Sequence, residues 1–306
     1  MTTAVVITLL ASFIWAATSH IDKYLLCKID SSTTSIKTLM VFSTFVAGLV
    51  LSPIWLIINK FQIQINIGTL LIVFSASIVY ILSTYLYFKA LEKTDASIIA
   101  VMFQLIPVFS YVLGLIFFNE TLSLNQIIGG LIIIFASIII SIDFNNKSDK
   151  NKIMALVLML ISSFFSALYY ILFEIAMKNS GYNSIAFWYQ IGLILIGVAL
   201  LTVRSYRQEF LQMLKMNGKK FISINVANEG LNLAAHFMAN FANLTLPIAL
   251  VNVVCNGFNG AFVFIIGAVG VMLFPKVFSE DLSKKVIFQK VGCIVLGILG
   301  MAVMFL

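Results

Sequence analysis

The stretch YFKALEKTDASIIAVMFQLIPVFSYVLGLIFFNETLSLNQIIGGLIIIFASIII, residues 87–140, decides the fold. It contains the apolar run 96–118 and nearly all of the apolar run 122–142, which are separated by a short polar turn. Each run is close to the ~20 residues that an α-helix needs to cross the hydrocarbon core of a bilayer. Neither run alternates polar and apolar residues as membrane β-strands do. The stretch therefore predicts two consecutive transmembrane helices.

The composition extends this prediction to the whole chain. Of the 306 residues, 61% are hydrophobic and only 10% are charged, whereas soluble domains carry about 25% charged residues. Together with the two runs above, ten apolar runs are present: 3–27, 34–58, 67–91, 96–118, 122–142, 153–177, 184–204, 220–244, 247–274 and 286–306. We therefore expect an all-α polytopic membrane protein with ten transmembrane helices. The segment between the seventh and eighth runs, 204–220, predicts either an amphipathic helix on the membrane surface, with Phe210, Leu211 and Leu214 on one face, or a solvated loop.

The basic residues predict the orientation in the membrane. All Lys and Arg residues except Lys23, Lys60 and Lys178 lie at the ends of odd-numbered runs, on one side of the membrane. Cytoplasmic loops are enriched in Lys and Arg, so this side is predicted to be cytoplasmic. We thus expect a multi-pass protein of the cell membrane, inner or plasma, with both termini on the non-cytoplasmic side.

An internal repeat divides the chain into residues 1–146 and 147–306. ASF at 11–13 matches SSF at 162–164, KALEKTDASIIAVMFQ at 89–104 aligns with FANLTLPIALVNVVCN at 241–256, and NETLS at 119–123 aligns with SEDLS at 279–283. Each half contains five runs, and because five is odd, the second half enters the membrane from the opposite side. This is the inverted repeat of many secondary transporters, whose substrate site lies near the midplane between the halves.

The whole chain resembles the ten-helix transporters of the drug/metabolite transporter superfamily, of the EamA type. The resemblance is carried by residues in the first half: Trp15, Ala96, Ser97, Pro107, Gly114, Glu120, Thr121, Leu122, Gly129 and Gly130. The second half departs from this pattern, with Asn259 near the position of Pro107 and a longer turn before Glu280. The resemblance implies a transporter of five plus five helices. Members of the family carry amino acids and other metabolites, nucleotide sugars, sugar phosphates or small cations.

A polar stripe follows the eighth run, NVANEGLNLAAHFMANFANL, residues 225–244. Because its polar residues are spaced by one, three or four positions, they share one face of a helix: Asn225, Asn228, Glu229, Asn232, His236, Asn240 and Asn243. A carboxylate at the depth of Glu229 costs several kcal/mol unless it is paired, protonated or hydrated. The stripe therefore predicts a face of an aqueous cavity, and the alternative is that these amides join helices through hydrogen bonds.

Other candidate site residues lie on neighbouring runs. The ninth run carries Asn252, Asn256 and Asn259 on one face, and the repeat makes Gln104 the counterpart of Asn256. We expect runs 3, 4, 8 and 9 to line a central cavity, which Gln104, Asn232 and Asn256 face. Aromatic candidates for its wall are Trp15, Tyr80, Tyr87, Tyr169, Tyr170 and Tyr189. In the first run, snorkelling of Asp22 or Lys23 is the alternative to a functional role, and their depth argues against a Lys23–Glu174 pair.

The sequence favours transport over catalysis. It contains no H-E-x-x-H helix, phosphate-binding glycine loop or G-x-S-x-G elbow, so we expect no enzyme, cofactor, metal site or nucleic-acid partner. The leading hypothesis is a secondary transporter that moves a small polar metabolite, an amino acid or related zwitterion, by alternating access, coupled to protons or a counter-substrate. The alternatives are a flippase or exchanger of a lipid-linked or nucleotide-linked sugar, and a non-transporting scaffold or receptor. Substrate-binding candidates are Glu229, Asn232, His236, Asn225, Asn228, Asn252, Asn256, Gln104, Trp15 and Tyr80, with Glu229 and His236 as candidates for proton coupling.

Overall fold

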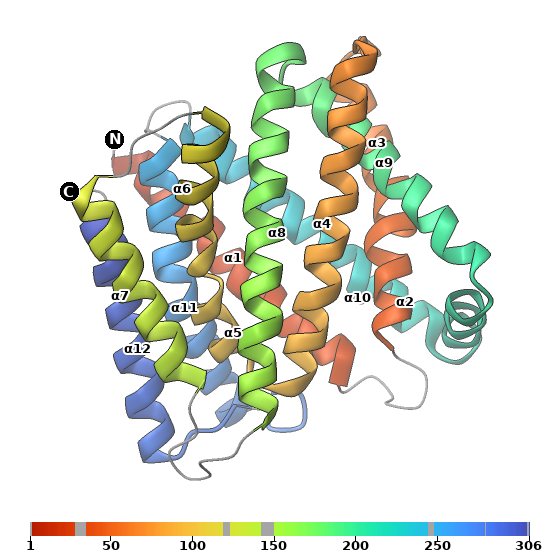
Figure 1. The fold of residues 1–306 in the computed structure, drawn as a ribbon. Helices are drawn as coiled ribbons and strands as arrows, with labels where there is room; N and C mark the ends of the chain where they lie inside the picture. The colour runs from red at the N-terminus through yellow and green to blue at the C-terminus, as the bar shows by residue number, and fades with distance from the viewer. Residues whose placement is uncertain are drawn as a thin grey trace.

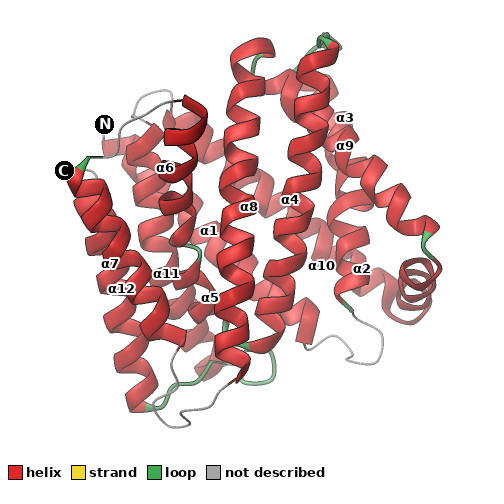
Figure 2. Cartoon of the chain, in the orientation of Figure 1, coloured by secondary structure: helices red, strands yellow, loops and turns green. Residues whose placement is uncertain are grey.

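The computed structural model describes residues 2–27, 35–118, 123–141, 150–243, 248–278, 280–304 and 306, and this part of the chain is a bundle of helices without strands (Figures 1 and 2). The elements are α1 (Thr2–Cys27), α2 (Ile36–Val41), the π-helical turn η1 (Phe42–Val46), α3 (Ala47–Ile58), α4 (Ile67–Lys93), α5 (Ala96–Met102), α6 (Leu105–Phe118), α7 (Leu124–Ser141), α8 (Lys150–Ser180), α9 (Tyr182–Thr202), α10 (Arg204–Asn243), α11 (Ile248–Leu273) and α12 (Lys284–Met304).

The prediction of an all-α polytopic membrane protein is confirmed. Among the described residues, eight helical segments are long and apolar enough to cross a bilayer, and α7 contributes a shorter apolar helix. The predicted eighth run is helical but lies in α10, which is not among the eight. The count of ten spans stays a prediction. The predicted boundary between the halves, at residues 146 and 147, lies outside the described residues, as does the Glu120–Leu122 turn.

The segment 204–220 is helical and continues without a break into the predicted eighth run, so that α10 spans 40 residues. The side chains of Phe210 and Phe221 are buried against Phe42, at ring-centroid distances of 5.2 and 4.8 Å. Phe210, one residue of the predicted apolar face, therefore packs on the protein, whereas Leu211 of the same face is 47% exposed. This contact explains why the residues form a helix in place of a solvated loop. The salt bridge between Glu209 and Lys37 joins the same segment to α2.

Two helical rods are interrupted within the bundle. The rod formed by α2, η1 and α3 changes from α-helix to a π-helical turn over Phe42–Val46, and such turns are frequent at functional sites. The rod formed by α5 and α6 is broken between these two helices, at Phe103 and Gln104. Pro107 has no N–H to offer the carbonyl of Phe103, which instead accepts a bond from Ile106 at 3.0 Å. Both interruptions give the bundle points where a helix can bend.

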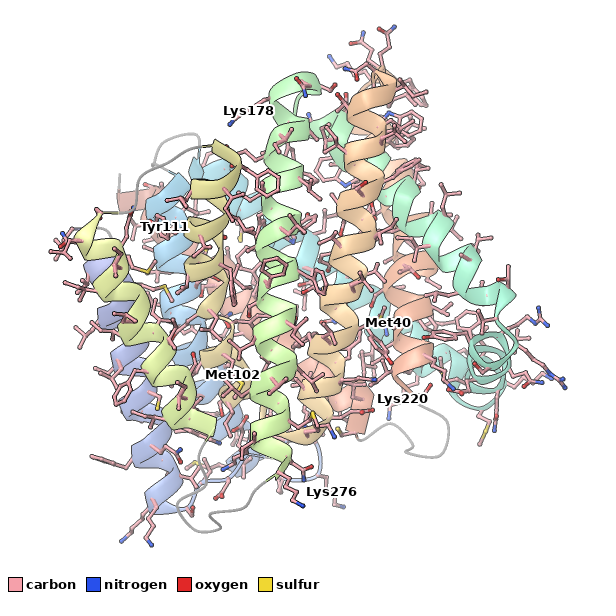
Figure 3. The ribbon with its side chains drawn as sticks, viewed as in Figure 1. Met40, Met102, Tyr111, Lys178, Lys220 and Lys276 are labelled. Atoms are coloured by element: carbon pink, nitrogen blue, oxygen red, sulfur yellow. The ribbon has the colours of Figure 1, made fainter. Side chains whose placement is uncertain are left out.

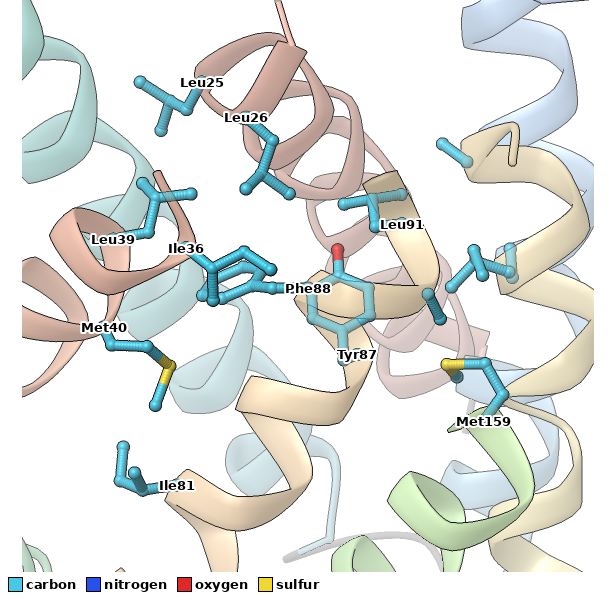
Figure 4. Close-up of a cluster of buried hydrophobic side chains, with 14 of the residues drawn as sticks. Leu25, Leu26, Ile36, Leu39, Met40, Ile81, Tyr87, Phe88, Leu91 and Met159 are labelled. Carbon is cyan, nitrogen blue, oxygen red and sulfur yellow. The ribbon is translucent and has the colours of Figure 1, made fainter. Parts of the chain in front are cut away.

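Long helices pack in pairs that join distant parts of the chain. Helix α4 packs on α8, α7 packs on α12, and α1 contacts both α10 and α11. Close approach of α7 and α12 depends on glycine, because a Cβ on Gly129 would lie 2.4 Å from the carbonyl oxygen of Gly300. A cluster of buried apolar side chains, shown in Figure 4, fills the space among α1, α2 and α4 and surrounds the ring of Tyr87.

The two chain termini lie at the same end of the bundle (Figure 1). Lys178 lies towards this end, whereas Lys220 and Lys276 lie towards the opposite end (Figure 3). This distribution agrees with the side to which the sequence assigned each of the three lysines. It does not by itself say which end is cytoplasmic, so the orientation stays a prediction.

Candidate functional site

A polar cluster forms where α1, α4 and α10 meet. Asp22 of α1 accepts one hydrogen bond at each carboxylate oxygen. The hydroxyl of Tyr87 donates to Oδ2 at 3.0 Å, and the side-chain amide of Asn228 donates to Oδ1 at 2.8 Å. Asp22 is therefore held inside the bundle by two helices, and its side chain does not snorkel to the membrane surface.

Glu229 follows Asn228 on α10 and lies beside this cluster. Its carboxylate accepts a hydrogen bond from the hydroxyl of Ser43, in the π-helical turn, and interacts electrostatically with Asp22. Two carboxylates that share a site within a membrane repel each other, so the pair is stabilised by a proton or a cation. The arrangement can bind a positively charged group or exchange a proton.

A cavity of about 120 Å³ opens next to Glu229. Its polar lining consists of Glu229 and Asn225, both on α10, and its other walls are apolar. These walls are formed by Phe42, Val46, Ala47, Val50, Leu51, Ile54, Val226, Gly230 and Leu233. One carboxylate and one amide thus face a space that is otherwise hydrocarbon, which is the usual character of a small-molecule site.

Two buried amide atoms at this site have no hydrogen-bond partner among the described residues. They are Nδ2 of Asn225 and Oδ1 of Asn228, and both side chains are buried. A buried polar atom without a partner costs about 1–3 kcal/mol. Such atoms are therefore expected where a ligand or water completes the bonding. Asn225 offers a donor and Glu229 an acceptor to the same cavity.

Three tyrosines pack together near Glu229. Tyr80 of α4, Tyr169 of α8 and Tyr189 of α9 have ring centroids 5.2–5.8 Å apart. Tyr80 and Tyr189 are close enough to Glu229 to interact with it electrostatically. The predicted aromatic candidate Tyr80 thus lies near the carboxylate, and Tyr169 and Tyr189 accompany it.

The polar stripe of α10 divides between two environments. Asn228 and Glu229 lie at the cluster of Asp22, and Asn225 lines the cavity beside Glu229. His236, in contrast, is exposed on α10 and contacts the ring of Trp15 edge-on, with centroids 5.1 Å apart. Asn232 is half-buried between these positions. The side chains of Asn240, Asn243 and Asn252 lie outside the described residues.

The remaining predicted candidates lie away from the cavity lining. Gln104, at the break between α5 and α6, is fully buried, and neither polar atom of its side chain has a partner among the described residues. It packs so closely on α12 that a Cβ on Gly297 would lie 1.7 Å from its Oε1. Asn256 is half-buried on α11, and Asn259 donates to the carbonyl of Ser12 at 3.3 Å.

A buried ion network lies towards the opposite end of the bundle from the termini. The ammonium of Lys290, on α12, lies 2.7 Å from a carboxylate oxygen of Asp95 and 2.7 Å from one of Glu280. Glu280 also accepts from the hydroxyl of Ser97 at 2.7 Å. The side chains of Lys290 and Glu280 are each only 1% exposed. Burial and the nearby Asp95 raise the pKa of Glu280, while Lys290 opposes this shift.

The sequence left a functional role for Asp22 open beside snorkelling, and it assigned no site role to this network. The sequence feature that pointed to Lys290 was its position inside the apolar run 286–306. Lys23 does not pair with Glu174, as predicted: its ammonium donates to the carbonyls of Leu91 and Thr94, at the C-terminal end of α4, where a cation is favoured by the helix dipole. Glu174 pairs instead with Lys178 at 3.0 Å.

No curated protein matches the sequence. A family model described as the EamA-like transporter family matches residues 2–142, the part of the chain from α1 to the end of α7. The first five apolar segments of the chain thus match the EamA-like transporters of the drug/metabolite transporter superfamily, and the helices long and apolar enough to cross a membrane agree with such a transporter.

Proposed function

We propose that the protein is a secondary transporter of a small polar metabolite with an amino group, an amino acid or related zwitterion, and that it works by alternating access. The observation that carries this proposal is the juxtaposition of Glu229 with Asp22 beside a cavity that also presents the unpartnered amide of Asn225. An ammonium group would lie against the carboxylates. A substrate carboxylate would accept from Asn225.

The charge of the cavity lining supports a cationic group on the substrate. No Lys or Arg is among the residues that line the cavity in the described part of the chain. Sites for phosphate-rich molecules usually provide Arg or Lys to pair with the phosphate oxygens. The lining therefore argues against sugar phosphates and nucleotide sugars.

The size of the cavity supports a conformational cycle. At about 120 Å³ it is smaller than the ~300–1,000 Å³ of most small-molecule sites. A metabolite would therefore bind after the wall opposite Glu229 moves. That wall is the π-helical turn Phe42–Val46 with the start of α3, and a turn of this kind marks a point where a helix rearranges.

Helix packing supports the inverted repeat of five plus five helices. In the repeat, α1 corresponds to α8, α4 to α10 and α6 to α11. The counterpart of the α4–α8 contact is therefore the α10–α1 contact, and the counterpart of the α6–α8 contact is the α11–α1 contact. All four of these helix contacts are present in the structure. The α7–α12 contact is its own counterpart, because α7 corresponds to α12. Two halves packed in this manner can tilt against each other about a central site, as alternating access requires.

The ion network of Lys290 supports a closed state at the lysine-rich end. It joins Asp95, before α5, and Glu280, before α12, through a buried ammonium. Opening this end would separate these elements. We propose that the network is the closed form of the gate on that side.

Glu229 is the first candidate for proton coupling, because a proton would relieve its repulsion with Asp22. His236 is the second candidate. It lies two turns along α10, ~10 Å from Glu229, so a proton passing between them would need water or substrate as a bridge.

A ligand screen tests the proposal. Purified protein is heated in the presence of amino acids, amines, sugar phosphates and nucleotide sugars, each at a concentration well above its expected dissociation constant. A ligand at 100 times its Kd stabilises the folded state by about 2.7 kcal/mol. We expect stabilisation by one or more amino acids or related amines. The Glu229→Gln variant should lose it, and Glu174→Gln, which neutralises an ion-paired carboxylate outside the cavity, should retain it. Stabilisation by nucleotide sugars alone would contradict the proposal.

A further inference from the structure

A groove between α7 and α12 lies outside the proposed transport site. Its volume is about 550 Å³, and it is lined by Ile139, Lys284, Lys285, Phe288, Gln289, Gly292, Cys293 and Leu296. The two helices are joined across it by the side chain of Gln289, which donates to the carbonyl of Ile139 at 2.7 Å. At Gly292 a Cβ would meet no atom within 4 Å, so this part of the groove is open. The groove therefore follows the α7–α12 interface and has an apolar floor.

Two lysines lie at the mouth of the groove. Lys284 and Lys285 are exposed and form the first turn of α12, which contains no acidic residue. Neither lysine has a carboxylate partner within the described ranges. The N-terminus of a helix carries a partial positive charge, which disfavours cations and favours an anion. The mouth of the groove thus concentrates positive charge that an anionic group would neutralise.

The dimensions of the groove match one leaflet of a bilayer. From Lys285 to Leu296 the helix rises ~16 Å at ~1.5 Å per residue, which is about half of the ~30 Å hydrocarbon core. The charged end lies at the end of the bundle opposite the termini, because α12 runs from there towards the C-terminus (Figure 1). An acyl chain would lie along Gly292, Cys293 and Leu296, while the side chain of Phe288, 83% exposed, would flank it.

We propose that this groove is a binding site for an anionic phospholipid from the leaflet that surrounds the end of the bundle opposite the termini, where Lys284 and Lys285 lie. The phosphate lies between the ammonium groups of Lys284 and Lys285, and one acyl chain occupies the apolar floor. Basic pockets between transmembrane helices bind anionic headgroups in this manner. The proposal is independent of the transport substrate, because no residue of the groove lines the cavity of Glu229.

Native mass spectrometry of the full chain, titrated with phosphatidylglycerol or with phosphatidylcholine, tests the site. We expect phosphatidylglycerol to bind more tightly. Replacing both lysines, Lys284→Ala with Lys285→Ala, should weaken its binding on the order of tenfold. The matched control is Lys219→Ala with Lys220→Ala, a second pair of adjacent exposed lysines on the same side, which should change the affinity less than twofold. Equal loss in the two double variants would overturn the proposal, since it would show general attraction to positive charge.

A second variant distinguishes binding of a whole phospholipid from binding of an anionic group alone. Gly292→Phe fills the open part of the groove and leaves both lysines in place. We expect it to weaken phosphatidylglycerol binding as much as the double lysine variant does. Inorganic phosphate at the same concentration should not compete. Unchanged lipid binding by Gly292→Phe, or competition by phosphate, would show that only an anion binds at the surface and would overturn the lipid site.

Discussion

Asn228 of α10 donates a hydrogen bond of 2.8 Å to Asp22 of α1, across 206 residues of sequence. This bond joins the first helix of the chain to the helix that carries Glu229. It places the carboxylate of Asp22 beside that of Glu229, which is the one carboxylate in the polar stripe of α10. Any substrate or proton that binds Glu229 therefore also experiences the charge of Asp22.

The first prediction concerns Asp22. The Asp22→Asn variant keeps the shape of the side chain and removes its charge, and Tyr87 and Asn228 remain beside it. Because the charge should act on the substrate or on the coupling proton, we expect transport in proteoliposomes to fall at least tenfold while the protein remains folded. Transport at the wild-type rate would show that Asp22 only positions α10.

The second prediction concerns the buried ammonium of Lys290. Lys290→Met leaves Glu280 and Asp95 without their cation, and breaking a buried pair in this way costs about 3–5 kcal/mol. We expect a large loss of thermal stability in detergent. Adding Glu280→Gln should restore part of the loss, because it removes the buried charge that was left unpaired.

The control for Lys290 is Lys178→Met. Lys178 also pairs with a glutamate, but its side chain is 60% exposed. Exposed pairs contribute at most about 1 kcal/mol, so this change should leave the stability nearly unchanged. If both methionine variants unfold at the same temperature, the network of Lys290 is not the closed contact that we infer.

The third prediction concerns the α7–α12 interface. A Cβ on Gly129 would meet the backbone of Gly300 at 2.4 Å, and backbone atoms cannot move aside cheaply. Gly129→Ala should therefore destabilise the fold by about 1–3 kcal/mol. Gly292→Ala, in the same pair of helices but facing open space, should be neutral or slightly stabilising. Equal melting temperatures for the two variants would contradict the close packing.

The fourth prediction concerns orientation. The distribution of Lys and Arg predicts that both termini lie outside the cytoplasm. A reporter that is active only outside the cytoplasm, fused after Leu306, should be active. A cytoplasmic reporter at the same position should be silent. The reverse pattern would overturn the assignment of the two sides.

The sequence indicated the part of this polar cluster that depends on one helix, while its role as a binding site stays a prediction. The spacing of Asn225, Asn228 and Glu229 indicated a shared face. The structure places Asn228 and Glu229 beside Asp22, and Asn225 beside Glu229 in the cavity lining. The sequence could not decide between a functional role and snorkelling for Asp22, because its position near the end of an apolar run also suits a side chain that reaches the surface. Only the crossing of α1 with α4 and α10 puts it beside Tyr87 and Asn228.

Contacts between distant segments account for the other differences. Lys290 appeared as one of the basic residues that set orientation, because its partners Asp95 and Glu280 come from other parts of the chain. The apolar face of the segment 204–220 was visible in the sequence. The surface that it covers, around Phe42, was not. Periodicity shows which face of a helix is apolar or polar, but not what that face meets.

The most direct test of the account is uptake of a radiolabelled substrate, identified in the ligand screen, into proteoliposomes that contain Glu229→Gln, driven by a proton gradient or by a counter-substrate. Uptake and substrate affinity are measured across pH 5–8 beside wild-type protein and the Glu174→Gln control. We predict that Glu229→Gln abolishes driven transport while Glu174→Gln leaves it unchanged. If Glu229 binds the ammonium, substrate affinity is lost, and if it carries the proton, affinity remains but no longer depends on pH. Wild-type transport with a wild-type pH response in Glu229→Gln would contradict both roles and assign the polar stripe to helix packing.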